Sequence, residues 1–365
     1  MSFQIVRNDI TRVCADAIVN TANPRPIIGG GVDTAIYMAA GEKELLAERT
    51  KIGELAPGQA AHTPAFHLPA RFIIHTVGPS WVDGAHGERE TLASCYANSL
   101  ALAADLSCES IAFPMIATGV YGFPKDEALQ IALSEIGRFL LTHEMTVTLV
   151  VFDRGALELS RQVVSGIEEY IDDHSARRIR EAEFRKTRVE SQRIYEEERR
   201  LAADQYHREA ETVRRRSVRK LRDDASEPAP SMAVYGAFPD AGEKTLDEVL
   251  ANKEETFQQR LLKLIDESGM DDVTVYKKAN IDRKVFSRIR CKEDYRPKKK
   301  TAMAFAIALQ LDLPTMTDLL SRAEIAISPS NTFDLIVSYF VTQRNYDIYE
   351  INAALFKYGQ PILGE

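Results

Sequence analysis

Apolar and polar positions in the first half of the chain follow two alternating periods. Short runs of β-branched and aromatic residues, typical of buried strands, cover residues 3–6, 17–20, 72–77, 111–116 and 147–152. Apolar residues at helical spacing lie between them, over residues 35–47, 89–106, 125–141 and 157–171. Strands that alternate with helices in this way predict an α/β sandwich with a largely parallel sheet.

The second half has no strand pattern and divides into three regions. Residues 175–225 carry 16 Lys/Arg and 11 Asp/Glu with no Gly or Pro, which predicts one long charged α-helix, isolated or in a weak coiled coil. Residues 226–245 contain three prolines and two glycines and predict a flexible linker. Residues 246–365 return to helical spacing with short breaks, as in a small all-α domain. We expect the long helix to hold this last domain away from residues 1–174, or to let the chain self-associate.

The composition excludes several classes of protein. The chain has 365 residues, of which 45% are hydrophobic and 27% charged, as in ordinary soluble proteins. No stretch approaches the roughly 20 apolar residues of a membrane span, and the N-terminus lacks the apolar run of a secretory signal. The four cysteines form no CxxC pair, which argues against a disulfide scaffold or a metal site. We expect a cytoplasmic protein that contacts no membrane.

Two glycine-containing loops carry the first chemical signal. Gly29-Gly30-Gly31 lies between the second predicted strand and a helix, and residues 117–124 lie between the fourth predicted strand and another helix. A hairpin explains one such run, but two strand–loop–helix units bring backbone N–H groups to the strand ends where α/β sheets bind ligands. Neither loop matches the P-loop or the GxGxxG pattern. The loops predict a cradle for a nucleotide diphosphate that needs no cofactor and no metal.

Residues 1–174 resemble a macrodomain, an ADP-ribose-binding module, of the MacroD type. The stretches that carry the resemblance follow the family's order and are residues 8–11, 17–23, 29–33, 39–41, 68–79, 95–100 and 113–124. The resemblance implies a three-layer αβα fold with a mixed sheet. It also implies that the partner is ADP-ribose or an ADP-ribosylated protein.

The resemblance assigns a binding role to residues in both loops and at two strand ends. In the family, the residue at Asp9 accepts from the adenine amino group, the residue at Tyr121 lies against the distal ribose, and the glycine loops hold the phosphates. Position alone would make Asp9 a helix cap and Tyr121 a packed aromatic, but the surrounding motif favours ligand contact. The full set of implied binding residues is Asp9, Ile10, Asn20, Gly30, Gly31, Val32, Thr118, Gly119, Val120, Tyr121 and Phe152.

Asp33 and Asn23 are the implied catalytic residues. Hydrolytic MacroD-type members carry an Asp after GGGV, as this chain does at Asp33, and Asn23 contacts the distal ribose. Cleavage at the anomeric carbon passes through an oxocarbenium-like state and needs an oriented water, which a carboxylate can hold or deprotonate. Asp33 could instead cap the following helix. Two departures from the family are Tyr37, where a His is usual, and the proline-rich residues 24–28.

These residues together predict an ADP-ribosyl hydrolase. Its reaction would remove mono-ADP-ribose from protein side chains, with Asp/Glu esters the expected linkage, or deacetylate O-acetyl-ADP-ribose. One alternative is a non-catalytic ADP-ribose reader coupled to a regulator. Another is a DNA-binding regulator whose first domain no longer binds ligand.

The last domain carries a basic segment within a chain of net charge −8. Residues 277–300 contain eleven Lys/Arg and three Asp/Glu, and residues 271–322 resemble the helix-turn-helix of XRE-family regulators. Phe286 and Ile289 should point inward from the second helix. The residues that would face outward to DNA are Arg283, Lys284, Ser287 and Arg288. A basic face of this kind suits DNA binding and protein interaction equally.

Overall fold

The computed structural model describes residues 2–152, 158–174, 255–292 and 294–364. The predicted charged helix and linker, residues 175–245, lie outside the described residues. Among the residues that are described, no helix is both long enough and apolar enough to cross a membrane.

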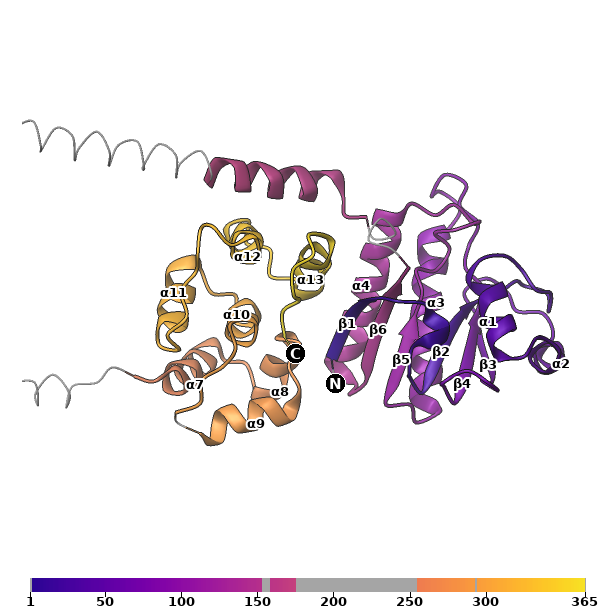
Figure 1. The fold of residues 1–365 in the computed structure, drawn as a ribbon, viewed down its shortest axis with the longest axis horizontal. Helices are drawn as coiled ribbons and strands as arrows, with labels where there is room; N and C mark the ends of the chain where they lie inside the picture. The colour runs from indigo at the N-terminus through magenta and orange to yellow at the C-terminus, as the bar shows by residue number, and fades with distance from the viewer. Residues whose placement is uncertain (1, 153–157, 175–254, 293, 365) are drawn as a thin grey trace, which may run out of the picture. The chain divides into compact units, whose positions relative to one another are not determined.

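One six-stranded sheet forms the centre of the first domain, in the order β1-β6-β5-β2-β4-β3 (Figure 1). The strands are β1 (Ser2–Arg7), β2 (Ala17–Thr21), β3 (Ala60–Pro64), β4 (Phe72–Thr76), β5 (Ser110–Phe113) and β6 (Thr146–Val151). All neighbours are parallel except β3, which runs antiparallel to β4. The five predicted strands and the mixed sheet are confirmed. The prediction omitted β3, a short edge strand with little apolar sequence.

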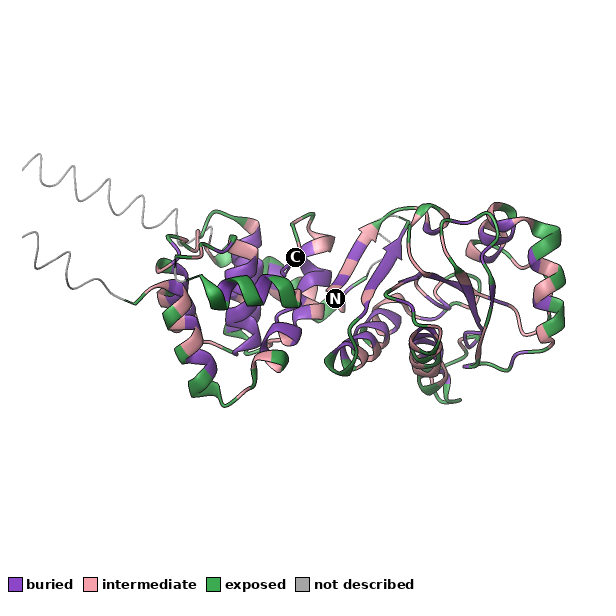
Figure 2. Cartoon of the chain, turned by 90° about the horizontal axis from the view of Figure 1, so that it is seen from below, coloured by how far each residue is buried: buried purple, intermediate pink, exposed green. Residues whose placement is uncertain are grey.

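Helices cover both faces of this sheet. They are α1 (Val32–Ala40), α2 (Glu42–Ile52), α3 (Glu88–Asp105), α4 (Lys125–Thr142) and the 3-10 helix η1 (Ile10–Arg12). A further helix, over 161–174, lies off the sheet (Figure 1), and its Tyr170 ring packs on Tyr339 of the C-terminal domain. Neighbouring strand residues alternate in direction: Ile18 packs with α1 and α2, and Val19 packs with α3 and α4. The three-layer αβα fold is therefore confirmed, and Figure 2 shows the buried helix faces and sheet. The helix predicted over 35–47 is two helices, because Gly41 (φ 107°) ends α1.

Residues 255–364 form the predicted all-α domain. Its helices are α7 (Phe257–Ser268), α8 (Asp272–Lys278), α9 (Arg283–Cys291), α10 (Lys299–Ala308), α11 (Leu313–Ser321), α12 (Thr332–Thr342) and α13 (Ile348–Lys357). Side chains cap most helix starts; Asp271 and Asp282, for example, accept from backbone N–H groups of α8 and α9. α10 is central, since every residue from Thr301 to Ala308 is buried.

The all-α domain packs directly on the first domain, and residues 1–171 and 255–365 form one compact unit. Asn280, in the left-handed turn between α8 and α9 (φ 52°), pairs with the edge strand β1. Its Oδ1 accepts from the Phe3 N–H at 2.7 Å, and its Nδ2 donates to the Phe3 carbonyl at 3.0 Å. The Lys277 ammonium donates to the Leu141 carbonyl at the end of α4, at 3.1 Å. The expectation that the two domains are held apart is therefore wrong.

Two helix-interior glycines mark the same interface. A Cβ at Gly137 of α4 would lie 2.8 Å from the Tyr349 ring of α13, and a Cβ at Gly166 would meet the Tyr339 hydroxyl of α12. Glycine inside a helix costs about 0.5–1 kcal/mol relative to alanine. The close approach of the two tyrosines accounts for its use at both positions.

Candidate active site

Two adjoining cavities open where the parallel strands end. One, of about 320 Å³, lies between the Gly29–Gly31 loop and the residues after β5; the other, of about 330 Å³, lies over η1 and α1. They share five lining residues, Gly31, Val32, Pro114, Val150 and Phe152. We call the two cavities together the groove.

The groove gathers almost all of the residues predicted from the sequence. Those that line it are Asp9, Ile10, Asn23, Gly30, Gly31, Val32, Asp33, Thr118, Gly119, Val120, Tyr121 and Phe152. Asn20 is the exception, because it is fully buried and lines neither cavity. A contact between Asn20 and ligand therefore stays a prediction from the sequence.

Asp33 holds the glycine loop in place. Its Oδ2 accepts from the Gly29 N–H at 2.5 Å and its Oδ1 accepts from Asn20 Nδ2 at 2.6 Å. The residue is only 2% exposed, and burial raises the pKa of its carboxyl group against the opposing effect of these two bonds. The helix α1 begins after Gly31 without a side-chain cap, so Asp33 does not act as the N-cap.

A buried polar chain extends behind Asp33. Asn20 and His75 are opposite each other on β2 and β4, and Asn20 Nδ2 lies 3.2 Å from His75 Nδ1. His75 Nε2 lies 3.0 Å from Thr63 Oγ1 on β3. Burial lowers the pKa of His75 to about 3, so its ring is neutral, and this network assigns the ring proton to Nε2. The prediction that His75 is a structural histidine is confirmed.

Arg49 of α2 holds the backbone of Asn23 and Pro24, which precede the glycine loop. Its guanidinium, 1% exposed, donates to the Asn23 and Pro24 carbonyls at 3.2 Å and also to the Gly53 carbonyl. None of the ion pairs among the described residues includes it. This role could not be predicted from the sequence, because Arg49 looks like one more charged residue of a polar helix.

Tyr37 is buried and lines neither cavity. Burial, together with the nearby Asp33 charge, raises the pKa of its hydroxyl to about 12. The side chain is therefore an uncharged group beneath the loop.

Tyr121 joins the second loop to the first. Its hydroxyl lies 3.5 Å from Asn23 Oδ1, and its carbonyl accepts from the Trp81 N–H at 2.8 Å. The loop turns at Ala117, which has φ 62°. Both proposed catalytic residues and Tyr121 thus lie at one end of the groove.

Asp9 lies at the other end and caps η1. Its Oδ1 accepts from the N–H of Thr11 at 3.0 Å and from the Thr11 hydroxyl at 2.8 Å, and these bonds lower the pKa of Asp9. Both bonds use the same oxygen, so the carboxylate can cap the helix and still offer Oδ2 to a ligand.

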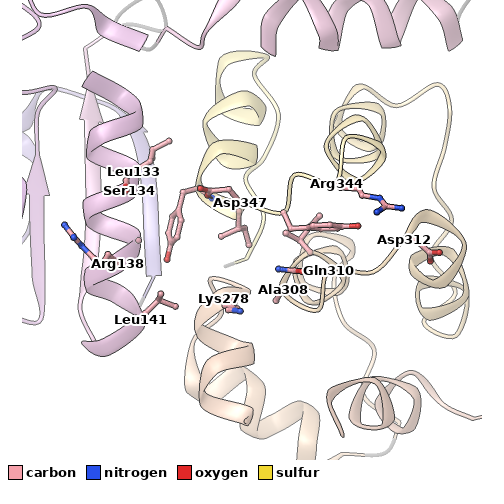
Figure 3. Close-up of a pocket in the computed structure, with 15 residues that line it drawn as sticks. Leu133, Ser134, Arg138, Leu141, Lys278, Ala308, Gln310, Asp312, Arg344 and Asp347 are labelled. Carbon is pink, nitrogen blue, oxygen red and sulfur yellow. The ribbon is translucent and has the colours of Figure 1, made fainter. Parts of the chain in front are cut away.

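A larger cavity, of about 830 Å³, lies between α4 and the all-α domain (Figure 3). Its lining mixes three cations with two acids: Arg138, Lys278, Arg344, Asp312 and Asp347. The two carboxylates are already engaged as caps of α11 and α13. It contains neither a glycine loop nor a strand end, so the groove remains the candidate site.

The second helix of the predicted helix-turn-helix is α9. Arg283, Lys284, Ser287 and Arg288 are exposed on it, and Phe286 and Ile289 are buried, as predicted. The turn itself is occupied, because Asn280 binds β1.

Comparisons with known proteins identify the family of the first domain. A family model described as Macro domain matches residues 19–132. A macro domain-containing protein of Chlorobaculum tepidum is 50% identical over 147 residues, which are 40% of this chain and 84% of that protein. An O-acetyl-ADP-ribose deacetylase of Citrobacter rodentium is 49% identical over 139 residues, 37% of this chain and 78% of that protein. The Oceanobacillus iheyensis macrodomain with ADP is 42% identical, with a TM-score of 0.40 over 42% of this chain and 84% of that one. The chain belongs to the macrodomain family.

Proposed function

We propose that this chain is an ADP-ribosyl hydrolase that binds ADP-ribose in the groove and releases it from an acceptor with water. The observation that carries the proposal is the placement of Asp33, Asn23 and both glycine loops along one groove. The similarity to proteins named O-acetyl-ADP-ribose deacetylase supports a hydrolase. The reaction requires no metal and no cofactor.

The ligand would lie along the groove with the adenine near Asp9 and Ile10. The diphosphate would then meet the N–H groups of the two loops, and the distal ribose would reach Asn23 and Tyr121. Phe152, 79% exposed and shared by both cavities, would cover the middle of the ligand.

Asp33 would orient the attacking water. Each carboxylate oxygen has a second lone pair beyond the bonds from Asn20 and Gly29, and the raised pKa makes the group a better proton acceptor. The water oxygen would bond to the anomeric carbon while the bond from that carbon to the acceptor oxygen breaks. One water proton passes through Asp33 to the leaving oxygen. For O-acetyl-ADP-ribose the water would attack the acyl carbon instead, and the bond from that carbon to the ribose oxygen would break, with a proton passing to the ribose oxygen and acetate released.

Turnover of a polypeptide mono-ADP-ribosylated on Asp/Glu tests this proposal. We expect release of ADP-ribose by the full chain, and a loss of about 100-fold or more in Asp33→Ala, because general base and water orientation are removed together. ADP-ribose binding, followed by calorimetry, serves as the control for folding. Tight binding without release, unchanged by the substitution, would support the reader instead.

We also propose that the exposed face of α9 binds DNA and directs the hydrolase to chromosomal targets. Three cations on this face, Arg283, Lys284 and Arg288, form no ion pair within the described part of the chain. Phosphate contacts from such residues supply sequence-independent affinity. An acidic protein face is the competing partner. Self-association through residues 175–225 stays a prediction.

A further inference from the structure

The loops around the groove expose an unusual share of apolar surface. Eight large apolar side chains are exposed in the described residues, and four of them, Ile27, Val82, Val120 and Phe152, lie on these loops. Val120 and Phe152 line the groove, so a bound nucleotide would cover them. Ile27 (59% exposed) and Val82 (67% exposed) line neither cavity. A ligand that only fills the groove leaves both in water.

Ile27 and Val82 stand beside the end of the groove where the two loops meet. The Ile27 carbonyl accepts from Asn23 Nδ2 at 3.1 Å, and Asn23 Oδ1 faces the Tyr121 hydroxyl. Val82 follows Trp81, whose N–H donates to the Tyr121 carbonyl. Both residues therefore lie next to Asn23 and Tyr121, at the end of the groove where the proposed reaction places the distal ribose and its acceptor.

The segment that carries Ile27 is held before any acceptor binds. Two prolines, Pro24 and Pro26, restrict the backbone, and the Ile27 N–H donates to the Arg25 carbonyl at 2.8 Å across Pro26. The buried Arg49 guanidinium donates a hydrogen bond to the Pro24 carbonyl. A surface ordered in advance loses less conformational entropy on binding. Arg25 is exposed there, and no ion pair among the described residues involves it.

We infer, resting on the proposed hydrolase function, that Ile27, Val82 and Arg25 form an acceptor rim that recognises ADP-ribosylated polypeptides rather than O-acetyl-ADP-ribose. An acetyl group is too small to cover two side chains on separate loops. A polypeptide extends from the modified residue in both directions and covers both. The fitting acceptor carries apolar side chains next to the modified residue and an acidic one that pairs with Arg25.

Two substrates separate the rim from the groove. The full chain and its Ile27→Ser/Val82→Ser variant are compared on a polypeptide mono-ADP-ribosylated on Asp/Glu and on O-acetyl-ADP-ribose. We expect kcat/KM for the polypeptide to fall about tenfold, through KM, because two apolar contacts are lost. Turnover of O-acetyl-ADP-ribose and the Kd for ADP-ribose should stay within about twofold. Val273→Ser removes an exposed valine of α8 and is the matched control.

The possible results of this experiment separate the acceptor rim from the hydrolase function on which it rests. A wild-type chain that turns over neither substrate overturns the proposed hydrolase and the rim together. A wild-type chain that is active on the polypeptide, with a double variant that keeps full activity or loses both activities in parallel, overturns the rim alone. Activity on O-acetyl-ADP-ribose without activity on the polypeptide also overturns the rim.

Discussion

Several residues that shape the groove never touch it. Asn20, His75 and Arg49 are each 0–1% exposed, and together they hold Asp33 and the chain from Asn23 to Pro24. A buried polar group is expensive unless it is bonded, so each of these side chains strongly specifies the position of its partner. The geometry of the loop therefore depends on this buried layer as much as on its glycines.

The neutral state of His75 makes stability depend on pH. Unfolded chains protonate histidine near pH 6.5, but the folded protein resists protonation down to about pH 3. The unfolded state thus binds more protons between these values, and stability falls as the pH falls. The slope from this one group approaches about 1.4 kcal/mol per pH unit.

Urea unfolding between pH 6.5 and 5 measures this slope, since carboxyl groups titrate mostly at lower pH. His75→Gln keeps a polar side chain and removes the titration, so its slope should be smaller than that of the wild type. Equal slopes in the two proteins would contradict the assignment.

The individual residues of the groove could be predicted because they lie in continuous motifs. Asp33 follows three glycines, and Tyr121 lies inside the second loop, so local sequence identifies them. Arg49 could not be found in this way. Two of its three carbonyl partners, Asn23 and Pro24, lie in a segment that only the fold brings to α2, and no local pattern marks a buried arginine.

Among the helices and strands, those with a strong local pattern of apolar residues could be predicted from the sequence. The strongly apolar strands and the helices α3 and α4 stand out, whereas β3 has one buried residue in five and no run to detect. Gly41 divides the helix predicted over residues 35–47, although its helical spacing is continuous. Gly137 of α4 permits the close approach of Tyr349, a contact that the helical spacing of residues 125–141 does not indicate.

Replacing that glycine should loosen α13 from α4. In Gly137→Leu the new side chain would occupy the position of the Tyr349 ring, so the contact must open. We expect faster hydrogen exchange in residues 348–357 and a loss of about 2 kcal/mol or more in stability. ADP-ribose binding should persist, since Gly137 is remote from the groove. Gln130→Leu, at an exposed position of the same helix, is the control and should change neither.

In the whole molecule, the two folded domains belong to one compact unit. Both domains could be predicted from the sequence, but their contact could not. The residues around Asn280 do not indicate which strand its side-chain amide will bind. The first 174 residues hold 22 Asp/Glu and 12 Lys/Arg, so an acidic domain accompanies the basic face of α9. Repulsion from the acidic domain favours the approach of a polyanion from the side of α9.

DNA binding should therefore be weak and strongly salt-dependent. If Arg283, Lys284 and Arg288 each contact a phosphate, the slope of log Kobs against log salt should be about −2.7. Arg288→Ala in the full chain should reduce its magnitude by about 0.9. Arg296→Ala, which removes a cation already paired with Glu324, is the comparison. A lack of duplex binding at low salt would leave the acidic protein partner.

The bond between Asn280 and Phe3 also bears on how the protein can be divided. β1 is the outer strand of the sheet, and the Asn280 amide occupies the Phe3 N–H and carbonyl that face away from β6. A fragment that ends at residue 174 keeps the whole groove but leaves that strand edge unpaired, an open template for another chain. Such a fragment should aggregate through β1 even though every ligand-binding residue is intact. Poor solubility of this fragment would then carry no information about whether the groove binds or hydrolyses its ligand.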